Sequence, residues 1–251
     1  MLLKLIKHEF IGTYKQSGGL IMAFLLLTLT LCGLNVIYDE VVEFQIFVGL
    51  LIVLFIIYII TVTFLFFTVF ALNVKRFSKN IFSEEGYLTN TLPVSASQII
   101  ISKSLVAMVW SIAASISVVV SVYILQFCSF GEGLYTSMDI NIKSIFDNPL
   151  YKFRVSMMAI IFLLSLYFLC YYAVASGRKS GKKSYLKTFF IVFAIFIAWL
   201  IVLSYIFVAF EMDDFLSSSD IVNIFTVYQF IMCVIFYIAT RWNLKNNLNL
   251  E

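Results

Sequence analysis

The residues that most resemble a reactive group are the adjacent carboxylates Glu84 and Glu85. Together they could suggest an intramembrane metalloprotease, but such a site needs histidines at helical spacing. The only histidine, His8, lies near the N-terminus, and no pair of the four cysteines has the spacing of metal ligands. The chain also lacks a GxSxG nucleophile motif. We therefore expect neither a metal site nor catalysis in this chain, and we expect all four cysteines to be small buried side chains.

A loop rich in glycine and lysine at residues 176–184, with the sequence SGRKSGKKS, has some likeness to a phosphate-binding loop. A Walker A loop has four residues between its glycines, followed by lysine and then serine or threonine. Here three residues separate Gly177 from Gly181, and Lys183 stands where the hydroxyl residue should be. We therefore expect no nucleotide site, and interpret the loop as a basic segment beside the membrane that can contact anionic lipid.

The elements that hold these residues are almost all hydrophobic. Hydrophobic residues make up 62% of the 251 positions and charged residues only 12%, about half the share that water-soluble domains carry. Several apolar runs exceed the ~18–20 residues that a helix needs to cross a bilayer. These features predict an all-α polytopic membrane protein, and the net charge of +3 gives no indication of a nucleic-acid partner.

Six apolar runs predict six transmembrane helices, and we interpret residues 1–251 as one transmembrane domain. The runs cover residues 20–37, 46–72, 98–127, 154–176, 186–210 and 221–240. The first run is longer than the apolar part of a signal peptide and ends in no clean cleavage site, so we expect it to be retained. The second and third runs are longer than a perpendicular crossing requires, so these helices either tilt or project into water.

Residues 1–18 are predicted to form an amphipathic helix in the headgroup layer. Apolar side chains share one face at the 3.6-residue period, namely Leu2, Leu3, Ile6, Phe10 and Tyr14. Cations line the opposite side, and this arrangement is typical of an interfacial helix. The Ser17-Gly18-Gly19 sequence then predicts a bend into the membrane. A plain extension of the first span is the alternative.

The distribution of charge predicts the orientation of the chain. With the N-terminus in the cytoplasm, all but three of the 17 lysines and arginines lie on the cytoplasmic side, the three exceptions being Lys143, Lys152 and Arg154. Basic residues are enriched in cytoplasmic loops. We therefore expect a multi-pass protein of the cell membrane, a bacterial plasma membrane, with an even number of spans and both termini cytoplasmic.

None of the six predicted spans has a charged residue near its middle. Carriers coupled to ions or protons usually bury ionisable groups there, so this pattern disfavours a secondary transporter. The third span instead has small and polar residues, at Ser111, Ala114, Ser115, Ser117 and Ser121. Small residues four apart let helices approach closely. We interpret them as packing positions inside the bundle, with a subunit seam or a pathway lining as the alternatives.

The longest polar-edged stretch lies between the second and third spans, and we expect residues 74–97 to be a cytoplasmic segment. Pro93 marks a break, because proline inside a helix removes a hydrogen bond. Ser95 and Gln98 have the spacing of a capping box, which predicts that the third membrane helix starts near Ser95. Upstream, a short helix is predicted with the carboxylate pair in its first turn, where negative charge favours the helix dipole.

Three stretches of this segment form a recognisable pattern, namely EEGYL at 84–88, TLPVS at 91–95 and IIISK at 99–103. An acidic residue before a glycine, then leucines, a proline followed by a small hydroxyl residue and a lysine in the third span resemble the first cytoplasmic loop of ABC-2 type permeases. The amphipathic N-terminal helix and the six-span topology are similar to the same family. The resemblance therefore covers the whole chain.

The resemblance implies the transmembrane subunit of an ATP-driven transporter, in which the first cytoplasmic loop forms a coupling helix that seats in a cleft of a separate ATPase subunit. Carried over by position, the residues of this contact are Glu84, Glu85, Gly86, Tyr87 and Leu88, with Leu92 and Pro93 shaping the exit. The family further implies no cofactor in this chain, ATP and magnesium on the partner, and pairing with a second copy or a similar permease. Export or extraction of an amphipathic peptide or lipid-like cargo is expected, and the aromatic spans suit such a cargo and plain packing equally.

The outer side departs from the family pattern. ABC-2 permeases often have an extended re-entrant segment between the fifth and sixth spans, whereas residues 211–220 are few and acidic here, and the longer outer loop is 127–153. Two other classes of function stay open at this point. One is a secondary carrier that works without ATP, and the other is a membrane scaffold or immunity protein. In both, residues 84–93 would be an ordinary amphipathic loop.

Overall fold

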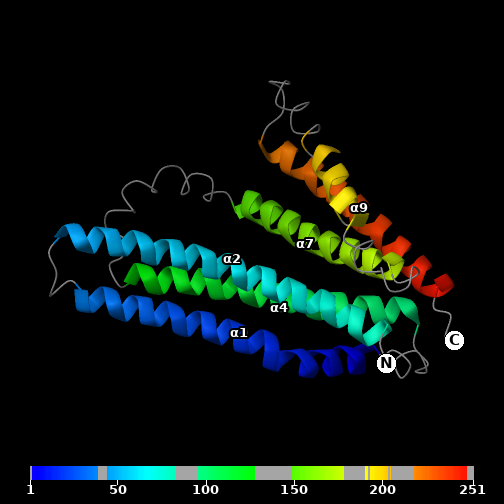
Figure 1. Cartoon of the computed structure of the whole chain (residues 1–251). Helices are drawn as coiled ribbons and strands as arrows, with labels where there is room; N and C mark the ends of the chain where they lie inside the picture. The colour runs from blue at the N-terminus through cyan, green and yellow to red at the C-terminus, as the bar shows by residue number, and fades with distance from the viewer. Residues whose placement is uncertain are drawn as a thin grey trace. The chain divides into compact units, whose positions relative to one another are not determined.

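A computed structural model describes residues 2–38, 44–82, 95–127, 149–177, 190–191, 193–202, 204 and 218–247. Apart from Ser95, these residues are helical, which confirms the prediction of an all-α protein. The long helices are α1 (Leu2–Tyr38), α2 (Phe44–Phe82), α4 (Ala96–Phe127), α7 (Pro149–Gly177) and α9 (Ser218–Asn247) (Figure 1). A shorter apolar helix covers Phe193–Val202.

Five of these helices are long and apolar enough to cross a membrane, so the chain is a multi-pass membrane protein. Each contains one predicted span, and each extends beyond it. The remaining predicted span, 186–210, contains the helix Phe193–Val202, whose described length is less than a crossing requires. Six spans therefore stay a prediction. α7 begins at Pro149, a residue that suits the first helical turn because its missing N–H would have no partner there.

The helix α1 runs without interruption from Leu2 to Tyr38, so a separate interfacial helix ending at a break near Ser17 is not confirmed. The face that the structure buries is polar in its first part, with Glu9, Thr13 and Ser17 at successive four-residue steps. The predicted apolar stripe is divided: Leu3 is 80% exposed, whereas Ile6 packs against the core. Buried polar groups in a membrane helix must find partners within the protein.

The chain divides into two compact units, which we describe separately. The N-terminal unit comprises Leu3–Asn73 and Leu105–Asp147, and the C-terminal unit comprises Met1–Leu2, Val74–Ser104 and Asn148–Glu251. Two helices contribute to both units. α2 gives 44–73 to the N-terminal unit and 74–82 to the C-terminal unit, and α4 gives 105–127 and 96–104 respectively.

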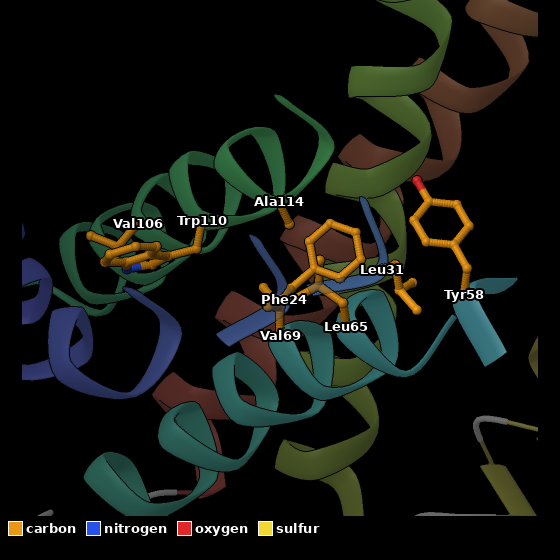
Figure 2. Close-up of a cluster of buried hydrophobic side chains, with 8 residues drawn as sticks. All are labelled: Phe24, Leu31, Tyr58, Leu65, Val69, Val106, Trp110 and Ala114. Carbon is orange, nitrogen blue, oxygen red and sulfur yellow. The ribbon is translucent and has the colours of Figure 1, made fainter. Parts of the chain in front are cut away.

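The core of the N-terminal unit forms where α1, α2 and α4 pack together (Figure 1). Eight buried hydrophobic residues from these helices compose it, as Figure 2 shows: Phe24, Leu31, Tyr58, Leu65, Val69, Val106, Trp110 and Ala114. The Tyr58 hydroxyl forms a hydrogen bond of 2.6 Å with the hydroxyl of Ser121, which joins α2 to α4. Ser111, Ser117 and Ser121 are buried, in agreement with a packing role inside the bundle.

Trp110 of α4 explains why the first turns of α1 belong to this core. Its indole Nε1 donates a hydrogen bond of 2.8 Å to the Thr13 hydroxyl. The ring of Phe10 stacks on the indole, with centroids 5.1 Å apart and planes 8° apart. A methyl group at Gly18 would meet the indole at 3.6 Å, an ordinary van der Waals distance. Phe10 and Thr13 thus contact one tryptophan, Gly18 lies beside it, and the helix continues past the glycines.

Hydroxyl groups on the outward faces are satisfied within their own helices. Thr63 donates to the carbonyl of Ile59 at 2.9 Å, and Thr30 donates to the carbonyl of Leu27 at 2.8 Å. Ser156 donates to the carbonyl of Phe153 at 2.8 Å. These bonds remove the cost of placing a hydroxyl against hydrocarbon.

The prediction that all four cysteines are small buried side chains is wrong for Cys32, which is joined in a disulfide. Cys170 and Cys233 are free thiols, half-buried and buried respectively, and Cys128 lies outside the described residues. Sequence spacing could not reveal this bond, because a disulfide depends on two Cα atoms coming within about 7 Å in the folded chain.

Candidate functional site

All seven residues predicted to contact an ATPase, from Glu84 to Pro93, lie outside the described residues. The structure describes the two helix ends that border them. α2 ends at Phe82 and α4 begins at Ala96, and both ends belong to the C-terminal unit. The candidate site is therefore built from these ends and from the helices that they contact.

The start of α4 is a reciprocal capping box, as the sequence predicts. The backbone N–H of Gln98 donates to the Ser95 hydroxyl at 3.3 Å, and the Gln98 side-chain oxygen accepts from the backbone N–H of Ser95 at 3.2 Å. The Ser95 carbonyl also accepts from the backbone N–H of Gln98 and of Ile99, at 2.9 and 3.2 Å. These bonds satisfy N–H groups that a helix start leaves without partners and set the first residue of α4.

The end of α2 has one exposed face and one buried face. The helix continues ten residues past its predicted span, which ends at 72, and Lys75 and Lys79 lie on its exposed side. Phe77 and Ile81, also four residues apart, are buried. Lys79 lies in the last turn, where a cation favours the helix dipole.

Phe77 contacts α7 from this helix end. Its ring stacks on Tyr171 of α7, with centroids 3.9 Å apart and planes 8° apart. Neither residue is measurably exposed. Stacked aromatic pairs contribute about 0.5–1.5 kcal/mol beyond the area that they bury. The stack ties the helix that precedes the predicted coupling segment to α7.

The stack continues as a chain of rings into α9. Tyr171 contacts Phe168 one turn earlier in α7, with centroids 6.5 Å apart. Phe168 in turn contacts Tyr237 of α9, with centroids 5.5 Å apart. We call Phe77, Tyr171, Phe168 and Tyr237 the aromatic chain. It connects the end of α2 with α7 and α9 through successive ring contacts.

α7 and α9 lie side by side (Figure 1), and polar contacts join them along this interface. The Ser165 hydroxyl lies 3.4 Å from the Gln229 side-chain oxygen and the Thr240 hydroxyl lies 3.4 Å from the carbonyl of Phe168, while each hydroxyl donates at 2.7 Å within its own helix. The Asn243 amide donates to the Ser176 hydroxyl at 2.8 Å. Interhelical hydrogen bonds of this kind contribute about 0.6 kcal/mol each within membranes. They hold the α7 side of the aromatic chain in a defined register.

The first turns of α4 are closely packed. Ile100 and Ser102 have no measurable exposure, and Lys103 is also buried. Lys103 is the lysine of the family pattern, and the structure places it in the second turn of α4. A buried ammonium group needs hydrogen bonds or an opposite charge from the surrounding protein. The start of α4 is therefore packed against protein and not freely solvated.

Sequence reasoning missed the role of Phe77. It lies in the sequence KRFSKNIF, where the neighbouring cations suggest a solvated stretch. The available signal was the four-residue spacing of Phe77 and Ile81, which continues the apolar side of α2 past the predicted span. Within the described helices, no group of three or more His, Cys, Asp or Glu side chains could hold a metal ion.

Comparison with known proteins identifies no relative of this chain. No protein-family model, no curated protein and no solved structure matches this chain. Its class therefore follows from its own helices, and the chain is an all-α, multi-pass membrane protein.

Proposed function

We propose that this chain is the membrane-spanning subunit of an ATP-driven transporter of the ABC-2 type, and that the coupling segment 74–97 receives the motion of a separate ATPase subunit through the contact residues between Glu84 and Pro93. The lengths of the bordering helices support this proposal. α2 has 39 residues and α4 has 32, so at 1.5 Å per residue they measure about 58 and 48 Å. A hydrocarbon core is only ~30 Å thick. Such helices can extend from the bilayer to a partner in water without a flexible joint.

The observation that carries the proposal is the stack of Phe77 on Tyr171. A partner that displaces residues 83–94 also displaces the end of α2, because the helix is continuous to Phe82. The buried stack then either carries α7 along or breaks. Packed side chains with two discrete arrangements are the means by which rigid elements transmit motion.

The topology that we propose has six spans, with both termini cytoplasmic and the aromatic chain near the cytoplasmic side. The disulfide at Cys32 supports this orientation. Disulfides persist outside the reducing cytoplasm, and Cys32 lies toward the end of α1 that this topology places outside. The outward apolar side chains of residues 2–18 suit the headgroup layer, although these residues are part of α1.

The remaining features of the proposal follow the family resemblance. ATP and magnesium would be bound by the partner ATPase, and a second copy of this chain or a similar permease would complete the pathway. The cargo would be an amphipathic peptide or a lipid-like molecule, exported or extracted from the bacterial plasma membrane. These features rest on analogy between families and not on a described site.

A pull-down in mild detergent tests the proposal, followed by charge reversal at the predicted contact. We expect a stoichiometric ATP-binding cassette subunit to copurify with the wild-type chain. The variant Glu84→Lys/Glu85→Lys should lose this subunit, because like charge would replace the proposed acidic contact. Asp213→Lys/Asp214→Lys is the matched control, since it reverses an adjacent carboxylate pair expected on the other side of the membrane. Assembly and ATP-dependent transport that survive the first change would refute the coupling assignment.

Two other classes of function give different results in the same experiment. A secondary carrier would transport without any ATPase, and a scaffold or immunity protein would bind its partner without ATP turnover. Buried polar residues do occur in the membrane helices, among them Gln229 in α9 and the ionisable Glu9 and Lys103, but no described residue near the middle of a predicted span is charged. This absence among the described helices favours the ATP-driven class over an ion-coupled carrier.

A further inference from the structure

The last turns of α9 have two distinct faces. Thr240, Asn243 and Leu244 are buried, and the hydrogen bond from Asn243 to Ser176 fixes this face against α7. This contact sets the rotation of α9 about its own axis, so the opposite side of the helix faces outward. It carries Arg241, Trp242 and Lys245, all of which are exposed. Trp242 is 64% exposed, although tryptophan side chains are highly buried on average. Arg241 and Lys245 lie on either side of it in the sequence.

The outward face changes chemistry along the axis of α9. Ile231, Ile235 and Ile238 are exposed and lie at helical spacing, so they form an apolar stripe. Trp242 follows one turn later, and Arg241 and Lys245 lie at the end. Apolar side chains, then tryptophan, then cations reproduce the order of hydrocarbon, interface and headgroup in one leaflet.

Within the described helices, the two cations are not neutralised by an ion pair. Neither Arg241 nor Lys245 forms an ion pair with any residue in the part of the chain that the structure describes. They are four residues apart on one face, so both can reach a single anionic group. Their charge is therefore available to a ligand at the level of the membrane surface.

We propose that Arg241, Trp242 and Lys245 bind the headgroup of an anionic phospholipid, whose acyl chains lie along the isoleucine stripe of α9. The cations select the negative headgroup, and the indole fixes its depth at the interface. A free phosphate would not use the apolar stripe, so the surface fits a lipid. This site rests only on membrane residence and on α9, and it is independent of the proposed transport function.

The native tryptophans provide a direct test. The chain has three, and Trp110 and Trp199 are only 8% and 1% exposed, so Trp242 is the one that lipid can quench efficiently. The full chain is placed in nanodiscs of phosphatidylcholine that contain a fixed fraction of brominated phosphatidylglycerol or of brominated phosphatidylcholine. We expect brominated phosphatidylglycerol to quench more strongly, with a preference of roughly fivefold for each cation. Trp242→Phe should remove most of the difference.

Two variants locate the selectivity. Arg241→Gln/Lys245→Gln should abolish the preference for phosphatidylglycerol while thermal stability stays unchanged, because both side chains are exposed. Lys4→Gln/Lys7→Gln removes two exposed cations from α1 and should leave the preference intact. Equal quenching by the two lipids in the wild-type chain would overturn the proposal, as would a preference that survives the α9 variant. If neither brominated lipid quenches Trp242, the proposal is also wrong, because a protein surface would then cover this face of α9.

Discussion

Phe77 of α2 and Tyr171 of α7 lie 94 positions apart in the sequence and stack face to face, with ring centroids 3.9 Å apart. Both rings are completely buried, although Phe77 is flanked by lysine and arginine in the sequence. A contact between such distant positions fixes the end of α2 against α7. It therefore offers the most informative position for mutation.

Replacing Phe77 by leucine should keep most of the buried volume but remove the stack. We expect the free energy of unfolding to fall by about 1–2 kcal/mol. If the proposed function holds, ATP-dependent transport should fall while the ATPase subunit still copurifies. Phe67→Leu is the matched control, because Phe67 lies on the same helix and is 70% exposed. Equal effects of the two changes would contradict a special role for the stack.

The capping box at Ser95 should contribute measurably to stability. Ser95→Ala removes the hydroxyl that accepts from the Gln98 N–H, and we expect a loss of about 1 kcal/mol. Gln98→Ala should cost less, and the double variant should cost less than the two single changes together, because they share one motif. Denaturant unfolding measures all three. Ser156→Ala, in an exposed mid-helix position, should change stability by less than about 0.5 kcal/mol.

Thr13 should be required to satisfy the buried indole of Trp110. Thr13→Val keeps the shape but leaves Trp110 Nε1 without its acceptor at 2.8 Å. We expect a loss of about 0.5–1.5 kcal/mol, the range of interhelical hydrogen bonds in membranes. Thr30→Val, on the exposed side of the same helix, should be nearly neutral. A red- or blue-shifted Trp110 emission in the Thr13 variant would report the changed indole environment.

Gly19→Ala tests whether α1 is continuous. A methyl group at this position meets nothing within 4 Å, and the backbone is in an ordinary conformation for L-residues. In a continuous helix the substitution should be neutral or should stabilise by up to about 1 kcal/mol. If the helix instead bends here and requires glycine, Gly19→Ala should lower the stability of the protein. Thermal unfolding in detergent separates the two outcomes.

The disulfide at Cys32 predicts a specific pattern of thiol labelling. In the denatured chain without reductant, a maleimide should react with Cys170 and Cys233 but not with Cys32. Reductant should make Cys32 reactive together with the cysteine to which it is joined. Removal of a structural disulfide typically costs 2–5 kcal/mol, so Cys32→Ser should also lower thermal stability. Reaction of Cys32 in the non-reduced chain would contradict the bond.

Local rules account for what the sequence predicts correctly. The capping box needs only Ser95 and Gln98, three residues apart, and the membrane helices need only long apolar runs. Contacts between distant positions were not predictable in this way. The stack of Phe77 on Tyr171 and the bond of Trp110 to Thr13 depend on which helices become neighbours. The continuity of α1 follows from the same cause, because the contacts of Trp110 outweigh the bend signal of Gly18 and Gly19.

The seven residues of the predicted ATPase contact rest on sequence alone, since Glu84–Pro93 lies outside the described residues. What the structure adds is the framework beside them. Lys75 and Lys79 face outward and Phe77 and Ile81 face inward, a division that composition could not assign because the two sets alternate within two helical turns.

The outward hydroxyls of Thr30, Thr63 and Ser156 each donate to a carbonyl of their own helix. Because each donor proton is used within its own helix, these hydroxyls can offer another chain only an acceptor oxygen. Threonine and valine are then nearly equivalent there, and the lipid-facing surface can accumulate substitutions over evolutionary time with little effect on the fold. The polar residues Glu9, Thr13 and Ser17 face inward and lack this freedom. Related chains should therefore be recognised by their buried polar positions, while their hydrophobic exteriors diverge.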